Sequence, residues 1–349
     1  MKRKKNSKKR MSRKHLLNAA KLLISVTLIT WLLQRIGLDT ILEQIRTADV
    51  SWIFVAVIMF AVSNVLGAVQ WYLLMRSQQV NVSLGHAISY YHVGLFFNNF
   101  LIGYVGGDAF RIYDIRRHSG DTTAAVSTVV FDRFIGFLMV TSIAMSVSLI
   151  WIRQLASLDT VYFIAAILLG WFFMLFLLFN QSAGKKFGRI CSPFVPGMLQ
   201  EKILSMSMAL NQFRHNRLLL IQVLAISLVV QLLRVMVHYW AALSVGVSVS
   251  MFYFLIFVPI IALFASLPIS FGGIGVREQS GVAVFSTIGV MASKVVTFEF
   301  LAYIVGIVAT IPGGLIFALR KEETLDAIRV QNTVQHSSLQ KGGSYHEKY

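Results

Sequence analysis

Two glycine-rich stretches contain the residues of this chain whose types and spacing could do chemistry. Residues 98–111 read NNFLIGYVGGDAFR, and residues 267–278 read LPISFGGIGVRE. Each stretch follows an apolar run and ends in an acid and a base. A guanidinium group matches phosphate oxygens with paired hydrogen bonds, while a carboxylate can pair with it or bind a cation or a proton. The acids and bases in question are Asp108, Arg111, Arg277 and Glu278.

The glycines and the proline in these stretches predict that the backbone is not helical there. Non-helical backbone at membrane depth must be buried in protein or line a wet cavity, because lipid offers its polar groups no partner. Two glycine-interrupted apolar segments in the two halves of a membrane protein point to a transport site near the midplane. The alternative is an ordinary loop between two spans, with the charges at the water interface. The predicted breaks are Gly103, Gly106, Gly107, Pro268, Gly272, Gly273 and Gly275.

Further charges lie inside apolar runs. Asp132 and Arg133 are about two turns into one run, and Arg234 lies between Gln231 and His238 in another. Adjacent residues on a helix do not face each other, so Asp132 and Arg133 should pair with other helices. The polar stripe at 231, 234 and 238 should face a cavity. The alternatives are an interfacial helix start for the first pair and snorkelling for Arg234.

Composition places the chain among membrane proteins. Hydrophobic residues make up 56% of it and charged residues 13%, and the mean hydropathy is +0.69. The apolar runs are about 20 residues long, as transmembrane helices require. We therefore predict an all-α polytopic membrane protein with about six to eight transmembrane helices, two of its segments being broken or re-entrant. The 32 Lys and Arg outnumber the 15 Asp and Glu, but they gather at the ends of the spans, so nucleic acid is not an expected partner.

The elements that must position the charged groups follow from the apolar runs. A basic tail at residues 1–15 should be cytoplasmic by the positive-inside rule. A membrane domain at 16–320 should consist of halves at 16–179 and 218–320, joined by a basic cytoplasmic segment at 180–217 with an amphipathic helix, and a polar tail at 321–349 should be disordered. The expected spans are 16–36, 50–75, 124–151, 161–179, 218–245, 252–270 and 295–319, with a short helix at 279–291.

Two local expectations concern the first half. Residues 38–49 should form a short, nearly neutral outer loop. Residues 84–107 should form a re-entrant hairpin, because Arg111, Arg116 and Arg117 then lie in a loop on the cytoplasmic side.

The two glycine stretches together resemble the lysylphosphatidylglycerol synthase transmembrane, or flippase-like, family. The resemblance rests on VGGDAFRIYDIRRHSGDTTAAVSTVVFDRFIGF and LPISFGGIGVREQSGVAVF and extends over residues 16–320. It implies a bacterial or archaeal inner-membrane protein that handles lipids. Bifunctional relatives carry further spans and an aminoacyltransferase domain, for which residues beyond 320 leave no room, so we expect no synthase activity.

The resemblance carries over residue by residue. One departure is Ile102, where the family usually has proline, so the bend must rest on Gly103. The matching positions are Asn99, Gly106, Gly107, Asp108, Arg111, Asp132 and Arg133 in the first half, and Pro268, Ser270, Gly272, Gly273, Gly275, Arg277 and Glu278 in the second.

Known catalytic and cofactor motifs are not found in the sequence. GGIG lacks the Gly-Lys-Ser/Thr ending of a phosphate-binding loop, the eight histidines are scattered, and no GxSxG is present. We expect no cofactor and no metal, and we interpret the chain as a non-enzymatic lipid-handling protein. It would bind and translocate an anionic or aminoacylated phospholipid or a polyprenyl-phosphate-type lipid, with Arg111 and Arg277 on the phosphate. The expected headgroup contacts are Asp108, Arg111, Asp132, Arg133, Arg234, Arg277 and Glu278.

Two alternatives stay open at this point. A membrane enzyme acting on a lipid-linked phosphate or sugar would use Asp108 or Glu278 as acid or base and would make a new lipid species. A non-transporting scaffold would recruit a partner or anionic lipid through its basic segments. Membrane lipids are the expected partners, with a homo-oligomer or a separate lipid-modifying enzyme as further candidates.

Overall fold

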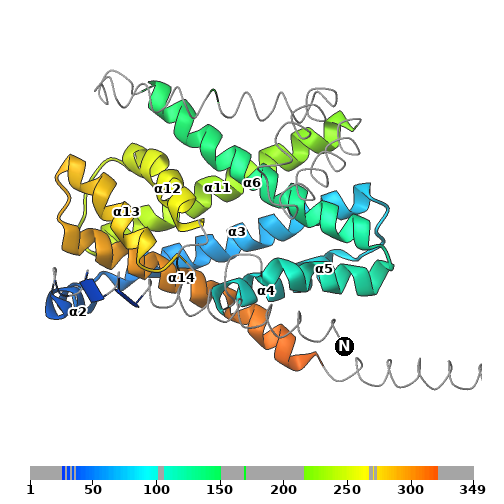
Figure 1. Ribbon diagram of the computed structural model, residues 1–349, viewed down its shortest axis with the longest axis horizontal. Coiled ribbons are helices and arrows are strands. Elements are labelled where there is room, and N and C mark those ends of the chain that lie inside the picture. The colour runs from blue at the N-terminus through cyan, green and yellow to red at the C-terminus, as the bar shows by residue number, and fades with distance from the viewer. Residues whose placement is uncertain are drawn as a thin grey trace, which may run out of the picture.

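The computed structural model describes residues 37–100, 106–150, 216–266, 270 and 273–320, with six isolated positions besides. All regular structure in these residues is helical, which confirms the all-α fold (Figure 1). The helices are α2 (Leu38–Arg46), α3 (Val50–Ser77), α4 (Leu84–Phe100), α5 (Gly106–Ser119), α6 (Thr122–Ile150), α11 (Arg217–Ser244), α12 (Met251–Ser266), α13 (Val276–Phe285), the 3-10 turn η1 (Ser286–Ile288) and α14 (Ala292–Leu319).

Four of the described helices, α3, α6, α11 and α14, are long and apolar enough to cross a membrane. The chain is therefore a polytopic membrane protein, as predicted. The spans expected at 16–36 and 161–179 lie almost wholly outside the described residues, as do the basic tail, most of the 180–217 segment and the C-terminal tail. The total of six to eight helices stays a prediction for that reason.

The expectation of a loop at residues 38–49 is wrong, because this segment forms α2. Leu38, Ile41, Leu42 and Ile45 recur at intervals of three and four residues, which gives a helix one apolar stripe. Ile41 is buried against Val296 of α14. The near-neutral charge of the segment concealed this amphipathic pattern.

Helices α4 and α5 form a hairpin, which the structure extends beyond the predicted limits of 84–107. The second limb is a helix that reaches Ser119, so Arg111, Arg116 and Arg117 lie in α5 and not in a loop. An acid in the first turn and bases in the last turn favour that helix through its dipole. The limbs have 17 and 14 residues, fewer than the roughly 20 needed to cross a bilayer.

The tip of this hairpin depends on Asn98 and Gly107. Asn98 Oδ1 accepts a hydrogen bond from the Gly107 N–H at 2.9 Å, which satisfies one of the free donors at the start of α5. A side chain at position 107 would collide with the Gly94 carbonyl oxygen and the Asn98 side chain. Gly103 and Ile102 lie outside the described residues.

Helices α12 and α13 form a second hairpin. Gly273 and Gly275 have φ angles of +76° and +85°, in the left-handed region that glycine adopts without strain. Gly275 is the residue before α13, which begins at Val276, three residues earlier than the predicted helix at 279–291. The break is therefore at the predicted place, although Pro268 and Gly272 lie outside the described residues.

The described helices form two sets with one order: long helix, short helix, short helix, long helix, and in each set the sequence between the two short helices contains glycine. The contacts correspond as well, since α4 packs on α14 as α12 packs on α6, and α3 packs on α11. The Asp49 N–H donates to the Ser244 oxygen at 2.8 Å, and Leu74 shares a cluster with Leu219, so α3 and α11 run antiparallel. The sets α3–α6 and α11–α14 are therefore inverted repeats.

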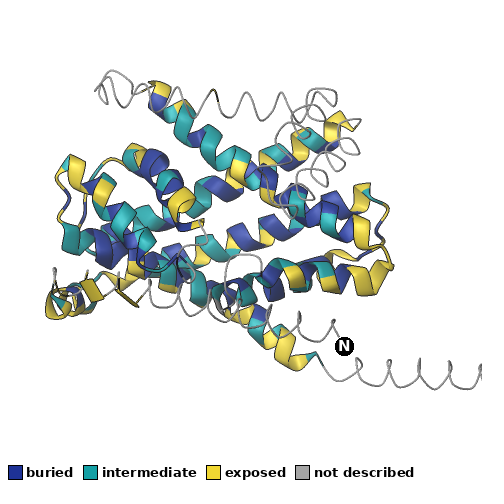
Figure 2. Ribbon diagram, viewed as in Figure 1, coloured by how far each residue is buried: buried dark blue, intermediate teal, exposed yellow. Residues whose placement is uncertain are grey.

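Because the repeats are inverted, the two hairpins enter the helical bundle from opposite ends of the molecule. Figure 1 shows α4 and α5 on one side, α12 and α13 on the other, and both tips near the middle. Buried residues concentrate along the crossing helices between them (Figure 2). On the side of the second hairpin, the rings of Phe254, Phe285 and Phe298 pack with centroids 4.8, 5.2 and 5.8 Å apart and join α12, α13 and α14.

Close packing of α14 on the first hairpin yields a stability prediction. A Cβ at Gly313 would collide with the backbone oxygen of His92. The other nearest atoms also belong to the backbone, so no flexible side chain can move aside to make room. We expect Gly313→Ala to lower the free energy of unfolding by about 1–3 kcal/mol through overpacking. Gly85→Ala is the matched control, because a Cβ at Gly85 meets nothing within 4 Å. Thermal unfolding of both variants in detergent tests this; equal stability would show that α14 and α4 separate easily.

Candidate functional site

Arg111 is the centre of a buried ion network at the inner end of the first hairpin. Its Nη2 donates to Asp132 Oδ2 at 2.8 Å, and its Nη1 lies 3.4 Å from Asp108 Oδ1. The guanidinium carbon lies 4.2 Å from the Trp71 ring centroid and 4.6 Å from that of Tyr91. Only 2% of the Arg111 side chain is exposed, so carboxylates and aromatic faces replace its water.

Arg133 makes the second ion pair of the network. Its Nε and Nη2 donate to the two oxygens of Asp108 at 2.9 and 3.0 Å, the two-point geometry that arginine and carboxylate favour. Asp108 is on α5 and Arg133 on α6, so the pair joins the hairpin to a spanning helix. The prediction that Asp132 and Arg133 pair with other helices is confirmed, because α5 supplies a partner for each.

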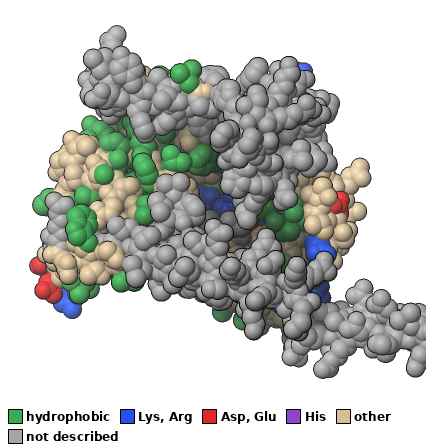
Figure 3. Space-filling view, in the orientation of Figure 1, with side chains coloured by type: hydrophobic (Ala, Val, Ile, Leu, Met, Phe, Trp, Pro, Cys, Tyr) green, Lys and Arg blue, Asp and Glu red, His purple; other side chains and the backbone are tan. Residues whose placement is uncertain are grey.

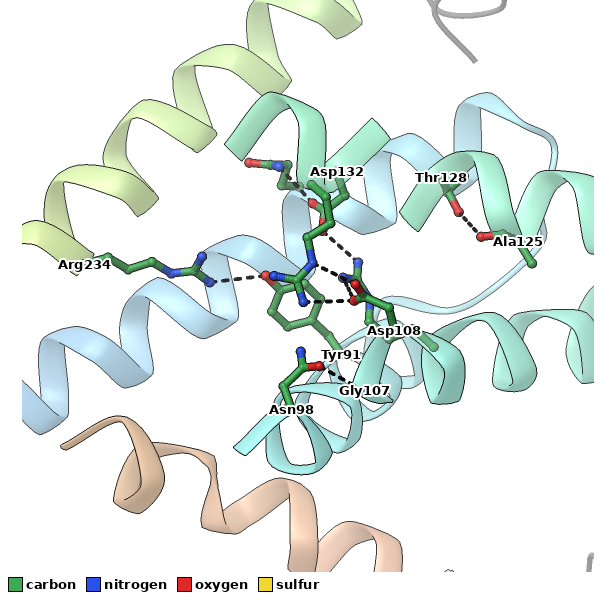
Figure 4. A network of polar contacts seen from close by, with 11 residues as sticks. Tyr91, Asn98, Gly107, Asp108, Ala125, Thr128, Asp132 and Arg234 are labelled. Carbon is green, nitrogen blue, oxygen red and sulfur yellow. Dashed lines mark hydrogen bonds and ion pairs between the residues drawn. The ribbon is translucent and has the colours of Figure 1, made fainter. Parts of the chain in front are cut away.

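The remaining partner of Asp132 comes from α3. Gln70 Nε2 donates to Asp132 Oδ1 at 2.9 Å. Both oxygens of this buried carboxylate therefore accept a hydrogen bond, one from Arg111 and one from Gln70. Figure 4 shows these contacts converging from α3, α5 and α6.

Arg234 reaches the network from α11. Its Nη2 lies 3.4 Å from the hydroxyl of Tyr91, whose ring also packs on Arg111 (Figure 4). Arg111, Arg133 and Arg234 stand against Asp108 and Asp132, so the network carries one positive charge, three minus two.

Several donors in this network have no acceptor in the described part of the chain. They are Arg111 Nε, Arg234 Nε and Trp71 Nε1; the acceptor Gln70 Oε1 is unpartnered there as well. An unpartnered buried donor costs about 1–3 kcal/mol. A net positive charge with spare donors is an arrangement that an anion would complete.

A second polar cluster lies at the other hairpin. Glu278 Oε2 accepts from the Gly275 N–H at 2.7 Å. His238 Nδ1 lies 3.0 Å from Oε1 of Glu299, which is fully buried. The Arg277 guanidinium lies 5.2 Å from the Tyr303 ring centroid.

The structure thus brings together five of the seven predicted headgroup residues, Asp108, Arg111, Asp132, Arg133 and Arg234. Arg277 and Glu278 belong to the second cluster, where Arg277 lies against the Tyr303 ring and Glu278 accepts from the Gly275 N–H. The polar stripe of α11 lies between the clusters, since Arg234 contacts the first and His238 the second. Asn99 of the predicted motif donates to Thr310 of α14 at 2.7 Å.

Sequence reasoning missed three residues of the network, Gln70, Trp71 and Tyr91. Gln70 is an uncharged polar residue in a run whose neighbours are apolar, a weak signal on its own. Trp71 and Tyr91 look like ordinary apolar packing until Arg111 is placed between them. A search for polar and aromatic residues at helix positions facing a buried arginine would have found them, but that requires knowing which helices are neighbours.

Comparison with known proteins identifies the family. Residues 18–314 match the lysylphosphatidylglycerol synthase TM region. The chain belongs to this family. The match covers both hairpins and both polar clusters.

The chain is similar to a curated protein, the UPF0104 membrane protein PH1989 from Pyrococcus horikoshii. The two chains are 30% identical over 117 residues, which are 33% of this chain and 35% of the relative. The chain therefore matches about a third of that relative's length.

The ion network predicts a large stability loss on removing one partner. Arg111→Met leaves the buried Asp132 carboxylate without its cation, while Asp108 keeps Arg133, and we expect a loss of about 3–5 kcal/mol in the free energy of unfolding. The double variant Arg111→Met/Asp132→Asn should recover part of that loss, because it also removes the stranded charge. Equilibrium unfolding in detergent measures both.

Glu43→Gln is the control for this series. Glu43 is exposed on α2, so neutralising it should change stability by no more than about 0.5 kcal/mol. A loss for Arg111→Met no larger than that of Glu43→Gln would show that the network does not hold the hairpin in place.

Proposed function

We propose that this protein binds the phosphate of a membrane lipid at the first-hairpin network and carries the headgroup between leaflets. The lipid would be an anionic or aminoacylated phospholipid or a polyprenyl-phosphate-type lipid. The observation that carries the proposal is the surplus of one positive charge in the network, together with N–H groups of Arg111, Arg234 and Trp71 that have no acceptor in the described part of the chain.

The accessible member of the network is Arg133. Its side chain is 40% exposed, against 2% for Arg111. We therefore assign phosphate contact to Arg133 and to Arg234, whose Nη2 lies 3.4 Å from the Tyr91 hydroxyl, and a supporting role to Arg111. A phosphate would take the place of the Asp108 carboxylate on Arg133, since both present two oxygens to a guanidinium fork.

The surroundings suit a lipid whose head enters while its tails stay outside. The network is framed by apolar spanning helices, and Figure 3 shows basic side chains recessed at the centre of a face with hydrophobic side chains beside them. A free phosphate would need only the basic side chains. A lipid would use the basic side chains for its phosphate and the apolar helices around them for its tails.

The inverted repeats support translocation over static binding. In transporters built from such repeats, the site lies near the midplane between the halves, and rocking of one half against the other opens it to each side in turn. The end of the first hairpin opposite its tip is rich in arginine: Arg76, Arg116, Arg117 and Arg320 all lie there. By the positive-inside rule we therefore place this end on the cytoplasmic side of an inner membrane.

The proposal predicts that Arg133→Gln abolishes most lipid transport. Purified protein in phosphatidylcholine vesicles, with a trace of fluorescent phosphatidylglycerol quenched from outside by dithionite, reports movement between leaflets. Loss of one charge-assisted contact worth about 1.5–3 kcal/mol should weaken headgroup binding about 10- to 100-fold. Arg133→Lys should fall between, because lysine keeps the charge but loses the fork.

Arg46→Gln is the matched control, since Arg46 is exposed at the end of α2. It should transport like the wild type. Wild-type transport in Arg133→Gln and Arg234→Gln, both folded, would refute the proposed site. The appearance of a new lipid species in the vesicles would favour a membrane enzyme instead.

A further inference from the structure

We propose that His238 and Glu299, beside Glu278, form a proton-binding site whose occupancy is coupled to that of the headgroup site. The inference rests on the proposed function and names the ion that would drive it. The proton would bind Nε2 of His238 and produce an imidazolium paired with the Glu299 carboxylate, with no other bond changed.

The geometry of the pair defines the protonation site. Glu299 accepts through Oε1 at 3.0 Å from His238 Nδ1, so the neutral imidazole carries its hydrogen on Nδ1 and leaves Nε2 as the base. The His238 side chain is 18% exposed and Glu299 is fully buried. A proton can therefore reach the histidine, while the carboxylate that stabilises it stays out of water.

The site lacks one positive charge. Glu299 Oε2 has no hydrogen-bond partner in the described part of the chain, although the residue is fully buried. With a neutral histidine, Arg277 stands against Glu278 and Glu299, and the cluster carries one negative charge, one minus two. A proton on His238 brings the sum to zero. The described residues contain no group of acids and histidines arranged to hold a metal ion, so a proton fits better.

The neighbouring charges do not remove this deficit. Arg277 and Glu278 of α13 belong to the sum already, and Lys294 of α14 donates to the Gly246 carbonyl oxygen at 3.2 Å. The polar partners from α2 are uncharged, since Gln44 bonds Thr297 and Ser293. Helix α12 contains no charged residue, and the charged residues of α3 lie at or just outside its ends. On α4, His92 Nδ1 is hydrogen-bonded to the carbonyl oxygen of Ile88. Asp132 and Arg133 of α6 are in the first network.

Arg234 links the two sites. It lies one turn before His238 on α11, and side chains four residues apart on a helix are neighbours, at about 5–6 Å between Cβ atoms. An unneutralised Arg234 repels a protonated His238. An anionic headgroup on Arg234 removes that repulsion, so lipid and proton should each favour the binding of the other, and by the same factor.

The test is the pH dependence of lipid affinity. Full-length protein in detergent is titrated with fluorescent phosphatidylglycerol, whose phosphodiester keeps one charge between about pH 6 and pH 8, the range in which histidine changes charge. Wild-type affinity should rise as the pH falls, by several-fold and at most about tenfold per pH unit for one proton. Glu299→Gln and His238→Gln should still bind lipid but lose this slope, while Glu43→Gln keeps it.

The outcomes separate the two proposals. Wild-type binding of equal strength across the range would overturn the proton site and leave the headgroup site intact. An unchanged slope in both folded variants would overturn it too. Failure to bind at any pH would refute the proposed function as well. Binding of an aminoacylated, cationic headgroup that is independent of pH and lost in Glu299→Gln would make the pair a cation subsite and overturn the proton assignment.

Discussion

A guanidinium buried inside an apolar helical protein needs a full set of partners, and the first half of this structure is arranged to supply them to Arg111. Carboxylates come from α5 and α6, and aromatic faces come from α3 and α4. Desolvating such a cation without partners costs several kcal/mol. Arg111 therefore holds four helices in one arrangement, and the tip of the hairpin cannot move without disturbing them.

The repeats share a backbone plan but differ in charge. Asp108 and Glu278 are each the third residue of the short second limb of their hairpin, and both limbs follow a break that contains glycine. In the first half Asp108 pairs with arginines, and the network carries a surplus positive charge. In the second half Glu278 lies near Glu299, and with a neutral His238 the cluster carries a surplus negative charge. One inverted fold thus carries two polar clusters, and with a neutral His238 their net charges are opposite.

Sequence patterns revealed the parts that depend on local regularity. Hydropathy located α3, α6, α11 and α14 to within about three residues, and the glycines located the second break. The prediction that Gly106 and Gly107 break the first helix is wrong, because both are helical and begin α5. The α11 stripe and the need of Asp132 and Arg133 for partners on other helices followed from helical geometry. Sequence reasoning missed α2, whose segment is short and neutral, and α5, whose bases resembled a cytoplasmic loop. It could not tell that Arg111 is buried and Arg133 accessible, since exposure depends on which helices lie side by side.

The position of α11 removes the usual difficulty of explaining coupling between two sites. Signals across a protein require an element with two arrangements that both ligands bias. Here both proposed sites use one face of a single helix, with Arg234 and His238 one turn apart, and α11 packs along its length against α3. Direct repulsion between neighbouring charges is enough to link anion and proton, and the same proximity makes the linkage sensitive to any shift that separates the tip of the first hairpin from α11.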